Sequence, residues 1–217
     1  SLNSSLIFEH IWIDENLKSD KDVKILLDII KKRNIKYNFE SEKKINSISN
    51  TKNTQGIIAL VNIKDFYNNQ TFTDKILILD QISDPGNLGT IIRVCDWFGV
   101  ENIICSNPSV ELYNPKVIQA TTGSFLRVNV YYTDIEKVIK KLPDNFPIYG
   151  AFMDGKNISD LDLEENALLV MGNESLGIST RLSELISEKI GIRSEKTGIE
   201  SLNVAIATSI LLYEFKR

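Results

Sequence analysis

The sequence predicts an α/β protein in which a mostly parallel sheet is covered by helices on both faces and is preceded by a small α/β module. Two observations lead to this prediction. Short apolar runs alternate with amphipathic segments along the chain, and the polar, unpatterned stretch 64–75 divides the chain in two. Alternation of this kind is typical of parallel sheets, because each crossover between parallel strands needs a connecting helix.

The first region, residues 1–70, is predicted to form the small module. Its expected strands cover 6–13, 35–39 and 56–63, and its expected helices cover 19–34 and 42–49. Ser19 is a candidate N-cap of the first helix, whose apolar face is Val23, Leu26, Leu27 and Ile30. Positive charge gathers in "KKRNIK" (31–36) and "EKK" (42–44), which fits either RNA contacts or a solvated helix end.

The second region, residues 75–217, is predicted to hold the larger sheet. Its expected strands cover 76–82, 101–106, 128–133, 147–153, 167–173 and 190–192. Its expected helices are one ending at Gly99 and those at 115–123, 134–142, 179–189 and 201–217. Ligands of such sheets bind at the carboxyl ends of the strands, so the segments that leave the strands are the ones to inspect for function.

Composition excludes several classes of protein. The net charge of -4 over 217 residues argues against a general nucleic-acid coat but leaves room for a local site. The only histidine is His10, and the only cysteines are Cys95 and Cys105. These three residues are too few for a four-ligand zinc site, a disulfide framework or a Ser-His-Asp triad. Both thiols are expected to serve packing. Because no apolar run could span a membrane and no signal-peptide pattern is present, we expect cytoplasmic residence, no membrane partner and no metal.

The stretch "DPGNLGTIIR" (84–93) carries more polarity than packing needs. Pro85 and Gly86 suit a tight turn, Asn87 is a candidate helix cap, and Gly89 allows a close approach of the backbone. Arg93 lies one helical turn further on, within reach of an anion held by the loop, although a capped helix with a surface arginine explains the pattern equally well. The stretch matches neither the dinucleotide-binding glycine fingerprint nor the phosphate-binding loop.

Two later segments show the same excess of polar residues. In "LLVMGNESLGIS" (168–179) an apolar strand ends in glycine and then in Asn173 and Glu174, which a structural turn alone does not require. In "GIESLNVAIATSILLYEF" (198–215) Ser201, a candidate cap, and Asn203 begin a helix that is otherwise apolar almost all round. Since all three segments leave strands of one sheet, we expect their polar side chains to meet.

In order and spacing, "DPGNLGTIIR", "GNESLG" and "ESLNVAIAT" resemble the three motifs of the SpoU/TrmH family of SPOUT RNA 2'-O-ribose methyltransferases. The resemblance continues through "NPKVIQATTGSFLRV" (114–128) and covers residues 75–217. Residues 6–63, ending in "ISNTKNTQGIIALV", are similar to the later part of the family's ribosomal-protein-like RNA-binding module, so the module is interpreted as shortened at its start.

The resemblance implies a trefoil-knotted SPOUT sheet, S-adenosylmethionine as cofactor, structured RNA (ribosomal or transfer RNA) as substrate, and a homodimer. The implied catalytic residues are Asn87, Arg93, Glu174, Ser201 and Asn203. The implied cofactor contacts are Thr122, Gly123, Met171, Gly172, Ile192, Ser201 and Leu202.

Methyl transfer to ribose requires alignment of a poor nucleophile with a good electrophile and removal of a proton. The family proposal makes the arginine, here Arg93, the base. Because a guanidinium stays protonated, the alternative is that Arg93 pins a phosphate and stabilises the developing alkoxide.

Two positions depart from the family pattern. Gln119 stands where many members carry arginine, and the charged run Arg193-Ser194-Glu195-Lys196 follows Ile192 in place of an Ile-Pro-Met-like segment. The charged run motivates a second hypothesis, a non-catalytic RNA-binding or ribosome-assembly factor with the methyltransferase fold. A nucleotide-binding enzyme of ordinary Rossmann type is disfavoured because the glycine fingerprint is missing.

Overall fold

A computed structural model describes residues 7–49, 54–62, 76–164, 166–195 and 201–215. Contacts divide the chain into two compact units, residues 1–65 and 66–217, and each is described by itself. The stretch 64–75, where the sequence predicts the boundary, lies outside the described residues.

The first unit is a three-stranded sheet with helices. It contains β1 (Phe8–Asp14), the short 3-10 helix η1 (Glu15–Leu17), α1 (Lys21–Lys32), β2 (Tyr37–Glu40), α2 (Glu42–Ile48) and β3 (Ile57–Val61). The strand order is β2-β1-β3, with β2 parallel and β3 antiparallel to β1. The core joins Ile11 and Ile13 of β1 to Val23 and Ile30 of α1, which confirms the predicted apolar face of that helix.

Ser19 does not cap α1, contrary to the sequence prediction. The N-cap is Asp20, whose carboxylate accepts hydrogen bonds from the backbone N–H groups of Asp22 and Val23. A carboxylate at this position satisfies two free donors of the first turn and also interacts favourably with the positive end of the helix dipole.

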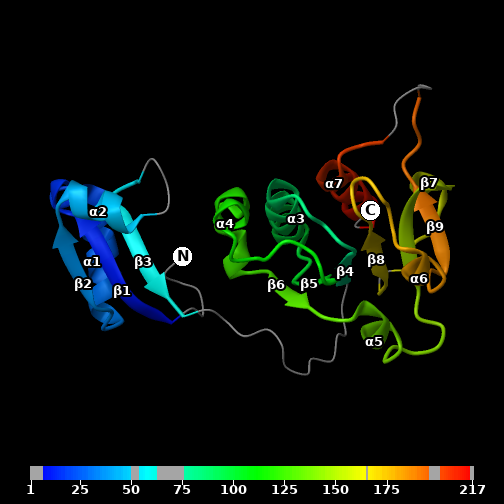
Figure 1. Ribbon diagram of the computed structural model, residues 1–217, viewed down its shortest axis with the longest axis horizontal. Coiled ribbons are helices and arrows are strands. Elements are labelled where there is room, and N and C mark those ends of the chain that lie inside the picture. Colours follow the sequence, from blue (N-terminus) through cyan, green and yellow to red (C-terminus); the bar gives the residue numbers. More distant parts are fainter. Residues whose placement is uncertain (1–6, 50–53, 63–75, 165, 196–200, 216–217) are drawn as a thin grey trace. The chain divides into compact units, whose positions relative to one another are not determined.

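The second unit is built around a six-stranded, fully parallel sheet of order β6-β5-β4-β8-β7-β9 (Figure 1). Its strands are β4 (Ile76–Leu79), β5 (Asn102–Cys105), β6 (Asn129–Tyr132), β7 (Ile148–Asn157), β8 (Leu168–Met171) and β9 (Glu188–Gly191). Its helices are α3 (Pro85–Phe98), α4 (Pro115–Thr121), α5 (Ile135–Ile139), α6 (Thr180–Ser183) and α7 (Val204–Glu214), with 3-10 turns η2 (Ser124–Leu126) and η3 (Ile158–Asp160). One face of the sheet packs against α3, α4 and α7, and the other against α5 and α6. The predicted α/β architecture with helices on both faces is confirmed; the trefoil knot stays a prediction.

The helix predicted over 179–189 is shorter in the structure. Helix α6 ends at Ser183, and residues from Glu188 onward form β9, which pairs with β7. Ile190 is fully buried in the core of the sheet, so strand pairing and burial there outweigh the local helix propensity of "LSELISEK".

Gly89 serves the packing of two helices. A Cβ at this position would lie 2.4 Å from the Cβ of Ala120 and 2.8 Å from the carbonyl oxygen of Val117, both on or beside α4. The close approach that the sequence assigned to Gly89 is therefore made by α4, whose contact with α3 fixes the start of α3 against the sheet.

Cys95 and Cys105 are fully buried in the core of the second unit, as predicted for packing roles. Burial raises the pKa of both thiols above its ordinary value. Both therefore stay protonated and unreactive in the folded protein.

A bidentate ion pair ties the end of α3 to the segment before β6. Arg127 Nε donates to Asp96 Oδ1 and Oδ2 at 2.9 and 3.0 Å, and its Nη2 contacts Oδ2 as well. The guanidinium of Arg127 holds the pKa of the Asp96 carboxyl below its ordinary value of 3.8. A lowered carboxyl pKa means that the stabilisation is complete above pH 3.8 and declines as the pH falls below it.

Asp96→Asn is expected to lower the free energy of unfolding by about 1 kcal/mol at pH 7, the upper range for a pair that is largely open to solvent. Urea unfolding of wild type and variant at pH 7 and at pH 3 measures the effect. The difference between the two proteins should shrink at the lower pH; an equal difference at both would contradict a charge-based role.

No helix among the described residues is long and apolar enough to cross a membrane.

Candidate active site at the carboxyl edge of the sheet

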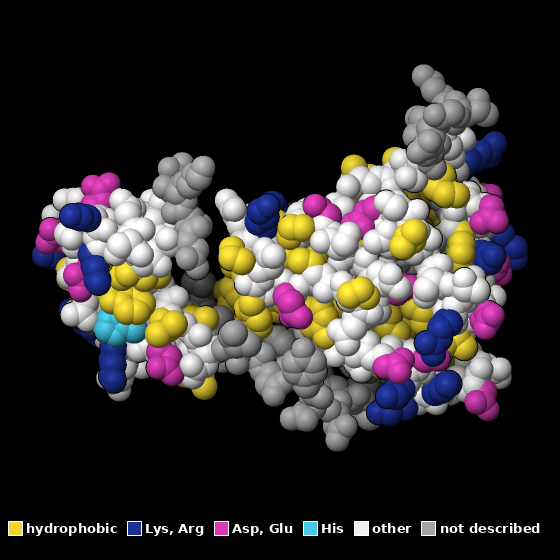
Figure 2. All heavy atoms as spheres, viewed as in Figure 1, with side chains coloured by type: hydrophobic (Ala, Val, Ile, Leu, Met, Phe, Trp, Pro, Cys, Tyr) yellow, Lys and Arg dark blue, Asp and Glu magenta, His cyan; other side chains and the backbone are white. Residues whose placement is uncertain are grey.

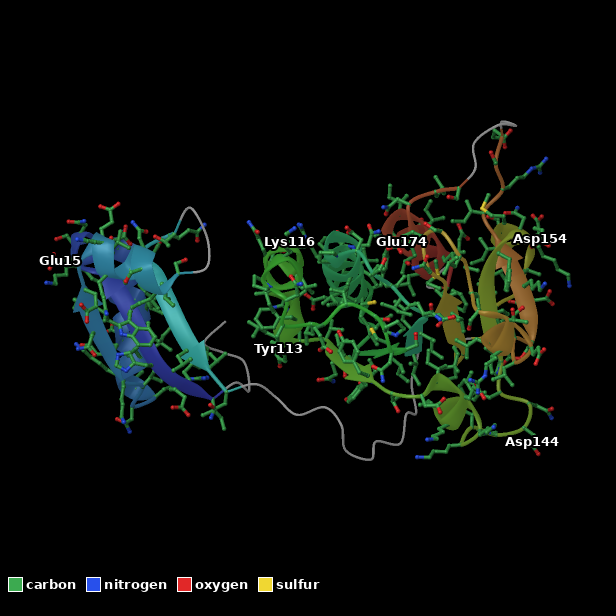
Figure 3. All side chains as sticks on the ribbon, in the orientation of Figure 1. Glu15, Tyr113, Lys116, Asp144, Asp154 and Glu174 are labelled. Carbon is green, nitrogen blue, oxygen red and sulfur yellow. The ribbon has the colours of Figure 1, made fainter. Side chains whose placement is uncertain are left out.

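Three of the predicted catalytic residues lie together at the carboxyl edge of the parallel sheet. Asn87 of α3 donates from Nδ2 to Glu174 Oε1 at 2.8 Å, and Asn203, just before α7, donates from Nδ2 to Asn87 Oδ1 at 2.9 Å. Glu174 follows β8, and Figure 3 shows it beside α3 and α7. The three motifs thus converge through their side chains, as the sequence analysis predicts.

The chemistry at both ends of this chain of hydrogen bonds fixes its direction. An ionised Glu174 only accepts, so the amide nitrogen of Asn87 must face it and the amide oxygen must face Asn203. The oxygen of Asn203 in turn accepts from the backbone N–H groups of Ala205 and Ile206. Each side chain therefore has one defined orientation, which pre-organises the edge for binding.

Neither Asn87 nor Ser201 is a helix cap, in contrast to the sequence prediction. Helix α3 begins at Pro85, and its N-cap Asp84 accepts from the backbone N–H of Asn87. Asn87 lies inside the first turn, so its side chain is free to bridge the other two motifs. The cap of α7 is Asn203, and Ser201 is exposed two residues earlier.

The loop after β8 is closed by its own backbone. Asn173 and Gly177 form a β-bridge, Asn173 Oδ1 accepts from the N–H groups of Ser175 and Leu176, and Gly177 has a φ of +70°. A Cβ on Gly172 would lie 2.2 Å from the carbonyl carbon of Gly177. Glycine at 172 is therefore a requirement of the loop that holds Glu174.

Arg93 is exposed on α3 and makes no hydrogen bond or ion pair within the described part of the chain. Its guanidinium is free to meet a substrate. Gln119 and Arg193, the two departures from the family pattern, are also exposed, whereas Lys196 lies outside the described residues.

The predicted cofactor contacts divide into two groups. Gly172 and Ile192 follow β8 and β9 at the carboxyl edge, and Leu202 precedes α7 with 45% of its surface exposed. Met171 is buried in the core, and its carbonyl accepts from the backbone N–H of Asp80.

Thr122 and Gly123 follow the last turn of α4 and precede β6. Ala120, two residues before Thr122, lies against Gly89 in the first half of α3. The N–H of Gly123 donates to Thr121 Oγ1 at 3.3 Å. The role of Thr122 and Gly123 as cofactor contacts stays a prediction.

Sequence reasoning missed two residues that support the site. Gln81, at the exit of β4, accepts from Asn173 Nδ2 through its carbonyl oxygen at 2.7 Å. The buried carboxylate of Asp80 accepts from the hydroxyl of Ser106 and from the backbone N–H of Ser179. The only signal in the sequence is an aspartate directly after an apolar strand, "ILILD". Among the described residues, no group of His, Cys, Asp or Glu side chains could hold a metal ion.

Comparison with known proteins agrees with this geometry. Residues 74–213 match the SpoU rRNA methylase family, and residues 2–67 match the substrate-binding domain of RNA 2'-O-ribose methyltransferases. The chain belongs to the SpoU rRNA methylase family. It is therefore an RNA methyltransferase that depends on S-adenosylmethionine.

Two of the relatives named here match almost the whole chain, and a third matches two thirds of it. The 23S rRNA (guanosine(2553)-2'-O)-methyltransferase RlmP of Bacillus subtilis is 27% identical over 99% of this chain and 89% of its own length. The S-adenosylmethionine-bound rRNA methyltransferase of Sinorhizobium meliloti superposes with a TM-score of 0.81 at 23% identity, over 98% of this chain and 80% of that one. The TrmH/SpoU tRNA-modifying enzyme of A. aeolicus is 29% identical with a TM-score of 0.58, over 67% of this chain and 75% of that one.

Proposed function

We propose that this SpoU-family protein transfers the methyl group of S-adenosylmethionine to a ribose 2'-hydroxyl of a structured ribosomal or transfer RNA in the cytoplasm. The observation that carries the proposal is the hydrogen-bonded set Asn87-Glu174-Asn203, together with the unpaired Arg93 further along the same helix, α3. The proposed RNA-binding module is residues 1–70, and the proposed methyltransferase domain is 75–217.

The residues at the carboxyl edge fit the cofactor. When bound, its sulfonium supplies an electrophilic methyl group. The carboxylate of Glu174 provides negative charge for a cation, while Ile192 and the half-exposed Leu202 provide apolar surface for an adenine ring. Gly172 allows the loop that holds Glu174 to fold tightly on itself, and Ser201 adds an exposed hydroxyl next to Leu202.

Calorimetric titration with S-adenosylmethionine tests the cofactor site. Wild type should bind saturably, and Leu202→Glu should weaken binding at least tenfold, because it places a second carboxylate where apolar surface is needed. Leu60→Glu, at a leucine of the first unit with 50% exposure, is the matched control and should bind as wild type does. Failure of folded wild-type protein to bind, with RNA binding retained, would favour the non-catalytic RNA-binding alternative.

We further propose that a second copy of the chain packs against α3 and α7. These helices lie side by side and expose Trp97 at 86%, Ile206 at 54% and Tyr213 at 58%. Large exposed apolar side chains on adjoining helices are characteristic of interaction surfaces. Arg93 lies one turn from Trp97 on the exposed face of α3, so a partner on this surface would border the active site.

Trp97→Lys is expected to convert a wild-type dimer into a monomer, because a charge replaces the largest exposed apolar side chain of the surface. Sedimentation velocity at micromolar concentration measures the mass. Lys140→Trp, which adds a tryptophan at the exposed C-cap of α5, should leave the mass unchanged. A monomeric wild type, or a variant that remains dimeric, would contradict this interface.

A further inference from the structure

A cavity at the same edge of the sheet is lined by none of the proposed catalytic or cofactor-binding residues. It has a volume of about 320 Å³ and opens between the ends of β4, β5 and β6 and the helices α5 and α6. Cavities of a few hundred Å³ at the carboxyl ends of parallel strands are common sites for small ligands.

Five uncharged polar residues line the cavity. Ser106 and Ser179 hydrogen-bond to Asp80, and the other three come one from each strand end. They are Gln81 after β4, Asn107 after β5 and Thr133 after β6. None of these three side chains makes a hydrogen bond within the described residues, although Gln81 and Thr133 are half-buried. Two amides and a hydroxyl therefore offer both hydrogen-bond donors and hydrogen-bond acceptors to a ligand in the cavity.

The charged groups around the cavity are already compensated. Asp80 is held by Ser106 and Ser179, and Glu136 of α5 pairs with Arg181 of α6 across the rim. Asp134 caps α5 and lies 3.7 Å from Lys137. Because the lining has three carboxylates and its one cation is paired, a phosphate group is disfavoured there and a neutral hydrogen-bonding ligand is favoured.

The backbone at Gln81 is held in a conformation that glutamine seldom adopts. Its φ is +58°, its N–H donates to Ser106 Oγ at 2.8 Å, and its carbonyl accepts from Asn173. Both hydrogen bonds hold the backbone of Gln81 in this conformation. Asn173 immediately precedes Glu174, so the cavity wall and the active-site loop are joined by one hydrogen bond.

We infer that this cavity receives an unstacked base of the substrate RNA, whose edge is recognised by Gln81, Asn107 and Thr133. The inference rests on the proposed function, since it assumes an RNA substrate at this edge. Single-stranded RNA is recognised in this way, through splayed-out bases with their hydrogen-bonding edges exposed.

Nuclear magnetic resonance of the labelled protein tests the cavity independently of methyl transfer. Adenosine, guanosine, cytidine and uridine are titrated separately, with inorganic phosphate as the anion control. At least one nucleoside should shift the amide signals of Gln81 and Thr133 saturably, while phosphate should not. Shifts from phosphate alone, or from none of the four nucleosides, would overturn the inference.

Two variants connect the cavity to catalysis. Thr133→Val removes one hydroxyl at nearly constant volume, and Gln81→Gly removes the amide while relieving the positive φ. Each should raise the KM for RNA about fivefold, the effect of one lost hydrogen bond, with unchanged affinity for S-adenosylmethionine. Thr180→Val, at an exposed threonine beside the cavity, is the matched control.

The assay uses RNA from host cells that lack the gene, with radiolabelled S-adenosylmethionine. An unchanged KM in both variants would overturn the role of the cavity in RNA recognition. Failure of the proposed function gives a different result, because wild type would then bind no S-adenosylmethionine and transfer no methyl group.

Discussion

Replacement of Asn87 by alanine is expected to lower the rate of methyl transfer about 10²-fold while leaving the protein folded. Among the described side chains, Asn87 alone hydrogen-bonds to both Glu174 and Asn203. Without it, the carboxylate loses its donor and the loop after β8 is no longer held against the start of α7. Small displacements of groups that align reactants are sufficient for a rate loss of this size.

The fold should survive because the first turn of α3 has its own cap. Asp84 accepts from the backbone N–H of residue 87, and this bond does not involve the Asn87 side chain. Thermal unfolding and transfer of tritium from labelled S-adenosylmethionine to RNA measure the two effects separately. Thr90→Ala, on the exposed face of the same helix, is the control. A rate within threefold of wild type would show that the hydrogen-bonded set is structural.

Arg93→Ala is expected to lower the rate of methyl transfer 10²- to 10³-fold, as the loss of a charge that stabilises a transition state commonly does. Stability should be unaffected, because Arg93 is exposed and without a partner in the described chain. If Arg93 is only a solvent-exposed residue of α3 with no role in the reaction, its removal would leave the rate of methyl transfer unchanged.

The pH profile of Arg93→Lys distinguishes the two possible roles of the charge. A lysine amine has an ordinary pKa of about 10.4, so a base at this position would become more active as the pH approaches that value. A stabilising cation would instead lose activity over the same range. We expect the decline, because a guanidinium stays protonated at neutral pH and the hydroxyl proton can leave to water or to the adjacent phosphate. The pH profile of wild type over the same range is the control for other effects of pH on the rate of methyl transfer.

The architecture could be predicted because its determinants are local. Apolar runs bounded by turn residues place every strand of the larger sheet within a few residues, and the three polar segments follow strands whose ends share one edge. The resemblance to a known family then identifies Asn87, Glu174 and Asn203, which the structure joins.

The sequence predictions are wrong where more than one neighbouring residue could fill the same structural role. Ser19 and Asp20 are both good caps, and only the backbone conformation shows that Asp20 fills the role. The same ambiguity applies to Ser201 and Asn203. The strand predicted at 190–192 begins two residues earlier, at Glu188, because it pairs with residues some forty positions before it, and periodicity does not reveal this pairing.

The cofactor contacts show a further limit of the sequence. Thr122 and Gly123 come from a motif that is continuous with the family pattern, and their contact with the cofactor stays a prediction. Asp80 and Gln81 were missed because their roles depend on Ser106, Asn173 and Ser179, which are distant in sequence.

The hydrogen bonds of Asn87 span 87 and 116 residues of sequence. Contacts at such separations form late, because the entropy of closing long loops must be overcome before they give any stabilisation. During synthesis, Asn87 and Glu174 leave the ribosome well before Asn203 does. A nascent chain of this enzyme therefore has no complete active site until the segment that contains Asn203 has been translated.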